Sequence, residues 1–379
     1  MKHLRIGLIG CGGMGAHHLN TFSQIDRLRF TACADIVPAN VKHVSDEHAV
    51  TGFSDGTKLL DSGLVDAVLV ATPHYDHPKY AMAAMKRGIH VLTEKPVAVT
   101  AKAAAQVNAC HKQHRRIVYA VMYQMRTVPL WQAVKKLIDE GRLGKLQRVS
   151  YTLTDWFRAQ AYFDAGTWRA TWAGEGGGVL VNQCPHNLDL LCWLVGSPAR
   201  VHAHLGLGKY HNIEVEDEVT AYLEYPGGAT GIFITSTGEA PGSNLMELCG
   251  NQGKISVAPG KPIDFIETAQ PVDQFIRRSK NPFGRPQSTT TQITPPDGGG
   301  HVVLTQNFVN AVLDGEPLLA PGTEGLAAIE LANAMIMSGV TGRPINIPTP
   351  RTAYEKLLKD LAAKARRARP KRKKTRKRK

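Results

Sequence analysis

The sequence contains no uninterrupted apolar run approaching the roughly 18 to 20 residues that a membrane-spanning helix needs. Its first residues, MKHLR, pass directly into a short strand-like run, without the apolar segment and small-residue cleavage site of a secretory signal. Hydrophobic residues make up 43% and charged residues 21%, a globular mixture that excludes wholesale disorder. We therefore expect a cytoplasmic protein with no membrane partner.

Cysteine is scarce, and none of it is arranged in close pairs. The six cysteines stand at positions 11, 33, 110, 184, 192 and 249, and no two of them form a C-x-x-C motif. This spacing supports neither a zinc knuckle nor a disulfide framework, so we expect reduced, mostly buried thiols. His74, Asp76 and His77 are confined to one predicted loop, which is a weak pattern for a metal site, and we expect no metal.

Acidic residues are absent from residues 364–379, where twelve lysines and arginines stand. Without this tail the chain has 34 basic and 32 acidic residues, so the formal charge of +14 falls to +2. A nucleic-acid binder needs several phosphate contacts from one surface, and a nearly neutral body argues against that class. We expect the tail to be disordered and solvated, with nucleic acid or another acidic partner as the alternative.

The first 125 residues alternate short, β-branched-rich apolar stretches with helical stretches. Continuous apolar runs are typical of parallel strands covered on both faces, and strands that alternate with helices indicate βαβ units. We therefore expect residues 1–125 to form an α/β domain with a doubly wound parallel sheet. The predicted strands are Leu4–Ile9, Leu28–Asp35, Val65–Thr72, Ile89–Thr93 and Ile117–Tyr123, and the predicted helices include Tyr80–Arg87 and Ala101–His114.

The pattern changes after a predicted helix over Trp131–Glu140. Apolar and polar residues alternate at 149–153 and 219–225, a Pro-Gly-Gly turn follows, and 229–235 returns as a strand, which indicates an antiparallel sheet with one exposed face. We expect residues 126–350 to form an α+β domain with a large open, mainly antiparallel sheet, followed by a helix or linker at 351–363. Helices over Val302–Leu313 and Thr323–Met337, after a Pro/Gly/Thr-rich excursion at 281–300, are predicted to cover one sheet face.

A G-x-G-x-x-G pattern follows the first predicted strand and opens a helix, and Asp35 stands twenty residues beyond its last glycine. Glycines let the backbone approach a diphosphate, which the N–H groups at a helix N-terminus bind. The Asp35 carboxylate suits the ribose hydroxyls of NAD and would repel the 2′-phosphate of NADP. The alternative is a tight turn with unrelated glycines. We expect NAD rather than NADP, with contacts from Gly10, Gly12, Gly13, Met14 and Gly15.

Lys95 follows the strand that is predicted to end at Thr93, at the carboxyl edge of the sheet. An ammonium beside a nicotinamide stabilises a developing alkoxide, although a lysine at a strand end is often only a solvated charge. A helix predicted from about Asn182 places Asn182, His186 and Asp189 on one face. A neutral histidine there accepts the proton of an alcohol, and the alternative is a buried histidine that caps backbone.

Three of the five tryptophans lie within seventeen residues, interleaved with charged side chains. Flat aromatic faces beside charged donors suit sugar rings, and the alternative is an ordinary aromatic core that includes Trp172. The substrate-binding residues predicted from this cluster are Trp156, Arg158, Tyr162, Trp168 and Arg169.

Together these motifs resemble the glucose–fructose oxidoreductase/inositol dehydrogenase/MocA (Gfo/Idh/MocA) family over residues 3–348. The resemblance rests on the glycine pattern, Thr-Pro-x-x-x-His at 72–77, Glu-Lys-Pro at 94–96 and the glycines 176–178 followed by His186 and Asp189. It implies a Rossmann domain joined to an α/β domain whose open sheet often forms dimer or tetramer contacts, so we expect a homodimer or homotetramer. The other expected cofactor contacts are Asp35, Thr72, Pro73, His74, His77, Glu94, Lys95 and Gln124.

The resemblance also implies that Lys95 and His186 form the catalytic pair, with His186 as the proton acceptor. Asn182 departs from the pattern, because many members have aspartate there. An asparagine can orient a substrate hydroxyl but cannot accept its proton. We therefore expect Asn182 to orient the substrate, with Asp189 or Asp155 as candidates for the missing carboxylate.

The sequence thus predicts an NAD-dependent dehydrogenase that acts on a secondary alcohol of a sugar, glycoside or cyclitol, with Lys95, Asn182 and His186 among the substrate-binding residues. The alternative is an NAD(H)-binding regulatory or assembly protein whose basic tail engages nucleic acid or an acidic partner. Lys95 and His186 favour catalysis, whereas the tail alone favours binding.

Overall fold

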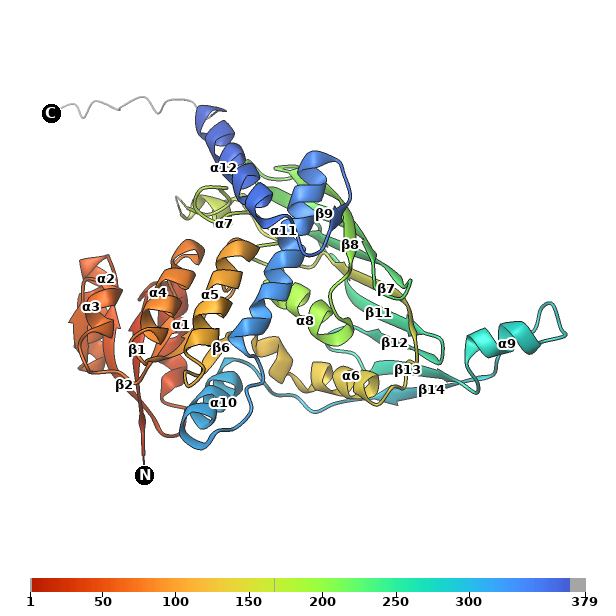
Figure 1. Cartoon of the computed structure of the whole chain (residues 1–379), viewed down its shortest axis with the longest axis horizontal. Helices are drawn as coiled ribbons and strands as arrows, with labels where there is room; N and C mark the ends of the chain where they lie inside the picture. Colours follow the sequence, from red (N-terminus) through yellow and green to blue (C-terminus); the bar gives the residue numbers. More distant parts are fainter. Residues whose placement is uncertain (1, 167, 369–379) are drawn as a thin grey trace.

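The computed structural model describes residues 2–166 and 168–368 and shows two sheets with helices packed between them (Figure 1). Within these residues the first sheet has six strands in the order β3-β2-β1-β4-β5-β6, and all neighbouring strands are parallel. This confirms the doubly wound parallel sheet. Its strands are β1 (Leu4–Ile9), β2 (Leu28–Ala34), β3 (Thr51–Phe53), β4 (Ala67–Val70), β5 (His90–Thr93) and β6 (Tyr119–Val121).

Helices cover both faces of this sheet, which is why the central strands read as continuous apolar runs. All four residues of β4 are buried. The strand β3 was not predicted, because its three residues include only one large apolar side chain and are largely exposed. The helices of this part are α1 (Gly13–Phe22), α2 (Pro38–His48), α3 (Gly56–Leu60), α4 (His77–Met85) and α5 (Ala101–Gln113), with a 3₁₀ turn η1 (His74–Asp76).

The parallel arrangement brings four distant segments of the sequence to one edge of the sheet. The glycine turn follows β1, Asp35 follows β2, Thr72 follows β4 and Lys95 follows β5. Ligands of open α/β sheets bind outside these carboxyl ends, so this edge is where a site is expected. The expected domain boundary at residues 125 and 126 falls within η2 (Gln124–Thr127), which leads into α6 (Pro129–Asp139).

The second sheet, counted over the described residues, has nine strands in the order β14-β13-β12-β11-β7-β10-β9-β8-β15. Its neighbouring strands are antiparallel except for the parallel pair β7 and β10, so the mainly antiparallel sheet is confirmed. The excursion at 281–300 contains a strand, because Ser288–Ile293 pairs with β13. The strands are β7 (Leu146–Leu153), β8 (Arg200–Leu207), β9 (Glu216–Glu224), β10 (Thr230–Ser236), β11 (Asn244–Gly250), β12 (Gly253–Val257), β13 (Ile263–Thr268), β14 (Ser288–Ile293) and β15 (Ile345–Asn346).

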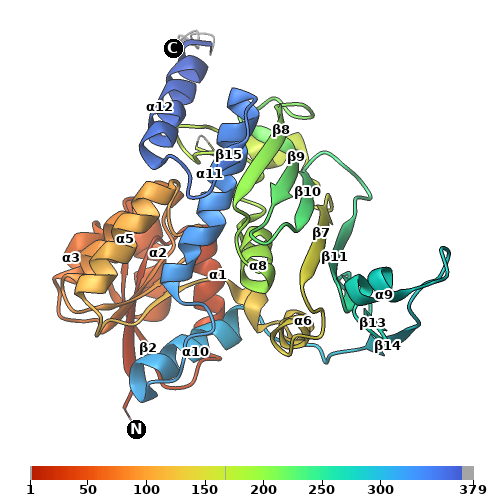
Figure 2. The same cartoon turned by 45° about the vertical axis from the view of Figure 1, so that its right-hand side comes forward.

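One face of this sheet is buried under α8 (Pro185–Val195) and α11 (Gly325–Thr341), which also contacts α5 of the first part (Figure 2). On the other face Tyr222, Ile232 and Leu245 are 45%, 40% and 43% exposed. The alternation of buried and exposed residues along β9 and β10 therefore matches the predicted half-exposed sheet. The remaining elements are α7 (Gln160–Asp164), α9 (Val272–Arg278), α10 (His301–Asp314) and η3 (Gly322–Glu324).

The last described element is α12 (Arg351–Ala368), which packs on the body through Tyr354, Leu358 and Ala362. Residues 364–368, which we expected in a disordered tail, continue this helix, so that expectation is wrong for them. The rest of the predicted tail lies outside the described residues. Among the described helices, none is both long and apolar enough to cross a bilayer.

Candidate functional site

A cavity of about 540 Å³ follows the carboxyl edge of the parallel sheet. The glycine turn and Asp35 line one end, and Lys95 and Asn182 line the other. Of the predicted cofactor residues, all except Gly15 and Gln124 line this cavity. The residues that sequence analysis assigned to a dinucleotide are thus brought together, namely Gly10, Gly12, Gly13, Met14, Asp35, Thr72, Pro73, His74, His77, Glu94 and Lys95.

The glycine turn has the shape that a diphosphate requires. Gly10 has a φ of +101°, and a Cβ there would lie 2.6 Å from the backbone of Ala71. A Cβ on Gly15 would lie 2.1 Å from the Gly10 carbonyl oxygen, so Gly15 lets α1 approach β1 closely. Gly12 and Gly13 instead face open space at the N-terminus of α1, where helix N–H groups attract an anion.

Asp35 closes the far end of this cavity. Its carboxylate accepts hydrogen bonds from the main-chain N–H groups of Cys11 and Val37, each at 2.8 Å. The neighbouring cavity residues, Ile36, Val37 and Asn40, carry no positive charge. A ribose hydroxyl fits beside this carboxylate, whereas a 2′-phosphate would meet a negative charge without a compensating cation.

A second cavity, of about 260 Å³, adjoins the first. Five residues line both cavities, namely Met14, Glu94, Lys95, Tyr162 and Asn182. Lys95 and His186 line the second cavity together with Met14 of the glycine turn. The predicted pair therefore lies in one cleft, next to the predicted dinucleotide site.

Lys95 is held by main chain rather than by an acid. Its Nζ donates a 2.8 Å hydrogen bond to the Asn182 carbonyl oxygen. Burial lowers the pKa of Lys95, and the nearby Glu94 and Glu175 carboxylates oppose that shift. Burial alone would raise the pKa of Glu94, but the 2.7 Å contact with His18 and the surrounding positive groups hold it at about 2. Glu94 is therefore a fixed negative charge behind Lys95.

His186 stands in the first turn of α8, where Pro185 starts the helix. Burial, together with the Lys95 ammonium, lowers the pKa of His186 to about 3, so the imidazole is neutral at physiological pH. Its Nε2 lies 3.4 Å from the amide nitrogen of Gln124, which lines the second cavity but not the first. The neutral imidazole therefore carries an unprotonated acceptor nitrogen at neutral pH.

Asn182 lies in the turn before α8, so the predicted helical register that placed it on one face with His186 and Asp189 is wrong. Pro185 fixes the helix start three residues later. The Asn182 main chain holds Lys95, and its side-chain amide donates to the Glu175 carboxylate. Asn182 therefore connects the lysine to a buried acid.

Neither carboxylate proposed as a replacement for the family aspartate reaches the site. Asp189 is buried in a bidentate ion pair with Arg126, at 2.6 and 2.8 Å, and lines neither cavity. Asp155 accepts a hydrogen bond from Asn244 on the surface. Sequence analysis missed Glu175, which is 2% exposed, because a lone acid before three glycines shows no periodic pattern.

The aromatic cluster divides between the two cavities. Trp168 and Arg169 line the first, Trp156 and Arg158 line the second, and Tyr162 lines both. Trp172 is 2% exposed and lines neither of them. The cluster is thus partly cofactor-facing and partly core, and only its first segment faces the second cavity.

The histidines of the 74–77 loop are occupied by protein contacts. Both ring nitrogens of His77 lie 2.7 Å from main-chain carbonyl oxygens, those of Pro96 and Thr72, and His74 packs its ring edge against Trp168. Over the described ranges 2–166 and 168–368, no group of three or more His, Cys, Asp and Glu is arranged to hold a metal ion.

Comparison with known proteins gives the same picture for both parts of the chain. Residues 4–122 match the oxidoreductase family with an NAD-binding Rossmann fold, and residues 131–256 match the GFO/IDH/MocA C-terminal domain. Levoglucosan dehydrogenase of Pseudarthrobacter phenanthrenivorans is 25% identical over 92% of this chain and 99% of its own. Inositol 2-dehydrogenase of Rubrobacter xylanophilus is also 25% identical, over 94% and 97%.

The structure of the WlbA dehydrogenase from Bordetella pertussis, in complex with NADH and UDP-GlcNAcA, is similar with a TM-score of 0.78 and 29% identity. The similarity covers 92% of this chain and 98% of that one. The two family matches and the relatives that align over nearly their whole length identify the same family. The cavity at the carboxyl edge of the parallel sheet agrees with this assignment. The chain belongs to the Gfo/Idh/MocA family of NAD-dependent oxidoreductases.

Proposed function

We propose that this protein transfers hydride between a secondary alcohol of a sugar, glycoside or cyclitol and NAD. The observation that carries the proposal is that Lys95 and His186 line one cavity, which adjoins the glycine turn through Met14. The relatives support the substrate class, because their names describe dehydrogenases of levoglucosan and of inositol.

The two side chains divide the work of oxidising an alcohol. The Lys95 ammonium stabilises the negative charge that develops on the alcohol oxygen. The neutral His186 accepts the hydroxyl proton at Nε2, since its Nδ1 is buried and inaccessible. NAD, when bound, supplies the acceptor for the hydride that leaves the alcohol carbon. The O–H and C–H bonds break as the C=O bond forms, and reduction of a ketone is the reverse.

The side chains that line the second cavity suit a polyol substrate. Besides the pair, it carries the amides of Gln124, Asn182 and Gln183 and the ring of Trp156. Amides both donate to and accept from hydroxyl groups, and an aromatic face suits the C–H face of a sugar ring. Asn182 orients a substrate hydroxyl in this arrangement, while its main chain holds Lys95.

The test is a spectrophotometric screen for NADH formation with NAD and, separately, NADP. The panel contains inositols, glucose, alkyl glucosides and anhydrosugars. We expect at least one member to reduce NAD faster than NADP. A complete absence of turnover with every polyol, in a sample that binds NADH, would contradict the proposed function.

Two further properties belong to the same proposal. We propose a homodimer or homotetramer formed through the outer face of the nine-stranded sheet, where Tyr222, Ile232 and Leu245 are exposed. We also propose a cytoplasmic location, because all six cysteines are free thiols, as in a reducing compartment. Light scattering of the wild type and of Ile232→Lys tests the interface, and a monomeric wild type would contradict it.

A further inference from the structure

Two arginines flank one aromatic ring in the cleft, and neither has an acidic partner. The guanidinium carbons of Arg158 and Arg169 lie 5.2 and 4.8 Å from the centre of the Tyr162 ring. Nine of the seventeen arginines before residue 364 form ion pairs, whereas within the described part of the chain no carboxylate lies within 4 Å of either of these two guanidinium groups. A guanidinium group without a carboxylate partner is available to bind an anion.

The two guanidinium groups serve different cavities. Arg169 lines the first cavity, which contains the glycine turn, and a dinucleotide there brings its own diphosphate. Arg158 lines only the second cavity, with Lys95 as the other cation. The acid that lines this second cavity, Glu94, acts on Lys95, as does the nearby Glu175. The positive charge that this cavity leaves uncompensated is therefore that of Arg158.

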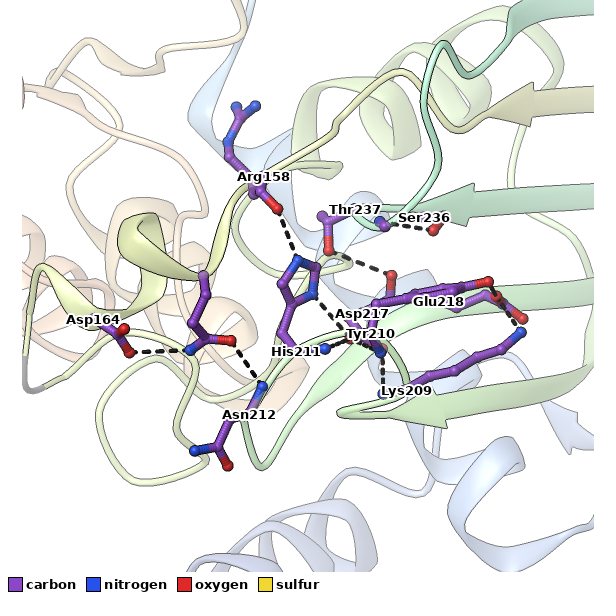
Figure 3. A network of polar contacts seen from close by, with 12 residues as sticks. Arg158, Asp164, Lys209, Tyr210, His211, Asn212, Asp217, Glu218, Ser236 and Thr237 are labelled. Carbon is purple, nitrogen blue, oxygen red and sulfur yellow. Dashed lines mark hydrogen bonds and ion pairs between the residues drawn. The ribbon is translucent and has the colours of Figure 1, made fainter.

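The backbone of Arg158 is fixed by a buried polar network (Figure 3). The Arg158 N–H donates to the Thr237 carbonyl oxygen at 2.9 Å, and its own carbonyl accepts from Nε2 of His211 at 2.8 Å. The other ring nitrogen of His211 lies 3.0 Å from the Asp217 carboxylate, which is 1% exposed. Figure 3 shows the guanidinium extending away from this network. The network thus fixes the main chain. The guanidinium donates to the Phe157 carbonyl oxygen at 2.8 Å and lies 5.3 Å from the centre of the Trp156 ring, which leaves its other N–H groups for an anion.

We propose that the substrate of the proposed dehydrogenase carries an oxyanion group, which Arg158 binds while Lys95 and His186 act on a hydroxyl elsewhere in the same molecule. This inference rests on the proposed function and narrows its substrate class to acidic sugars or cyclitols. A planar guanidinium forms two parallel hydrogen bonds to a carboxylate or a phosphate, so both oxyanions share this chemistry. His211 and Asp217 act as positioning residues for Arg158.

Binding of matched acidic and neutral polyols tests this without requiring turnover. Calorimetric titrations of the enzyme–NADH complex compare D-glucuronate with D-glucose, D-gluconate with D-glucitol, and D-glucose 6-phosphate with D-glucose. We expect the acidic member of at least one pair to bind about tenfold more tightly or better, as a charge-assisted hydrogen bond implies. The first two pairs report a carboxylate and the third a phosphate.

Variants identify the residue that makes the difference. Arg158→Gln is expected to reduce the ratio of acidic to neutral affinity to near one. Arg158→Lys is expected to retain part of this ratio, because a lysine keeps the positive charge but cannot form the two parallel hydrogen bonds of a guanidinium. Arg29→Gln removes an exposed positive charge elsewhere and should leave the ratio unchanged. Equal affinities for every pair, or an unchanged ratio in Arg158→Gln, would overturn the inference. Turnover of neutral polyols in the same samples would leave the proposed function intact.

A different observation concerns the buried acid behind Asn182. Glu175 has two hydrogen-bonded oxygens, of which one accepts from the Ala170 N–H at 2.6 Å and the other from the Asn182 amide. Its own carbonyl oxygen lies 3.4 Å from the His74 ring. Burial raises the pKa of Glu175 to about 7, against the effect of its hydrogen bonds and of nearby positive groups. Glu175 and Lys95 both contact Asn182. Glu175 accepts from its side-chain amide, and Lys95 donates to its main-chain carbonyl oxygen.

The geometry assigns to Glu175 the role of a positioning residue, which orients the Asn182 amide and supplies a negative charge that keeps Lys95 protonated. The other charged or titratable groups that face Lys95 are Glu94, Arg169, Cys184, His74, His186 and His301. Like the substrate inference, this one rests on the proposed function.

The pH dependence of kcat separates this role from a structural one. Glu175→Gln keeps the shape of the side chain but removes the charge, so the pKa of Lys95 falls and the alkaline limb of kcat moves to lower pH by about one unit. The double variant Glu175→Gln/Asn182→Asp places the carboxylate on the neighbouring side chain, at a residue whose main chain contacts Lys95. We expect it to return the alkaline limb toward its wild-type position, while thermal unfolding reports any loss of fold.

An alkaline limb that stays in place in Glu175→Gln would overturn this assignment, even if kcat decreases. A double variant that fails to restore the limb while remaining folded would do the same. Neither result bears on the proposed function, which is tested separately through Lys95 and His186.

Discussion

The two sides of the cleft are constructed in different ways. The side formed by the parallel sheet uses main chain, since the turn after β1 and the N-terminus of α1 provide its anion-binding surface. The opposite side uses side chains from the segment 156–186, which runs into the first turn of α8, among them Arg158, Asn182 and His186. The first side suits a ligand that all members of the family share. The second side suits the ligand that differs between members, which is the substrate.

This difference has a physical origin. A backbone turn requires particular residues at fixed spacing, because only glycine tolerates the close approaches at positions 10 and 15. A side-chain site only requires that several groups reach the same place, whatever their spacing in the sequence. We therefore expect substitutions on the two sides to separate cofactor binding, catalysis and substrate selection.

The largest effect is expected from removing the pair at the junction of the two sides. Lys95→Ala and His186→Ala should each lower kcat by about two orders of magnitude or more, because each loses a transition-state interaction that water replaces poorly. Steady-state rates with a substrate from the screen measure this. Lys42→Ala, at an exposed lysine of α2, is the matched control. Near-normal turnover in both variants would remove the mechanism.

The glycine turn offers a pair of variants that sharpen the contrast within one side. Gly15→Ala should destabilise the fold by about 1–3 kcal/mol, because its Cβ would lie 2.1 Å from a backbone oxygen that cannot easily move. Gly12→Ala meets no atom within 4 Å and should fold normally, but its methyl group should weaken NADH binding. Thermal unfolding and NADH titration measure the two effects. A normally stable Gly15→Ala variant together with a destabilised Gly12→Ala variant would contradict this description of the turn.

Substitution of Asp35 should change the choice of dinucleotide. Asp35→Ala removes the carboxylate that repels a 2′-phosphate, so the preference for NAD over NADP should decrease by about tenfold or more. The ratio of kcat/KM for the two cofactors measures this. Asp46→Ala, at an exposed acid of α2, is a suitable control. Unchanged discrimination in Asp35→Ala would mean that this carboxylate does not contact the ribose.

The same contrast explains how much the sequence could predict. The parallel sheet, the glycine turn and the location of Lys95 follow from local patterns, because strand ends and turns are set by neighbouring residues. The role of Glu175 depends on a loop that folds back on Asn182, and no periodicity reports such a contact. Asp189 was a plausible candidate by helical spacing, but its side chain is bound by Arg126 from η2, a partner 63 residues away.

The smallest effect is expected from the basic end of the chain. Deleting residues 369–379 removes nine lysines and arginines and should leave kcat and the NADH affinity unchanged, because every described residue that lines the two cavities lies before position 302. α12 should be kept, since Tyr354 and Leu358 are buried against the body and Lys102 pairs with Glu355 at 2.8 Å. A truncation that also removes α12 should therefore lower the thermal unfolding temperature, whereas the shorter one should not. Loss of turnover in the shorter deletion would show that residues 369–379 contribute to catalysis. The side of the cleft that is formed by side chains would then include residues beyond the segment 156–186.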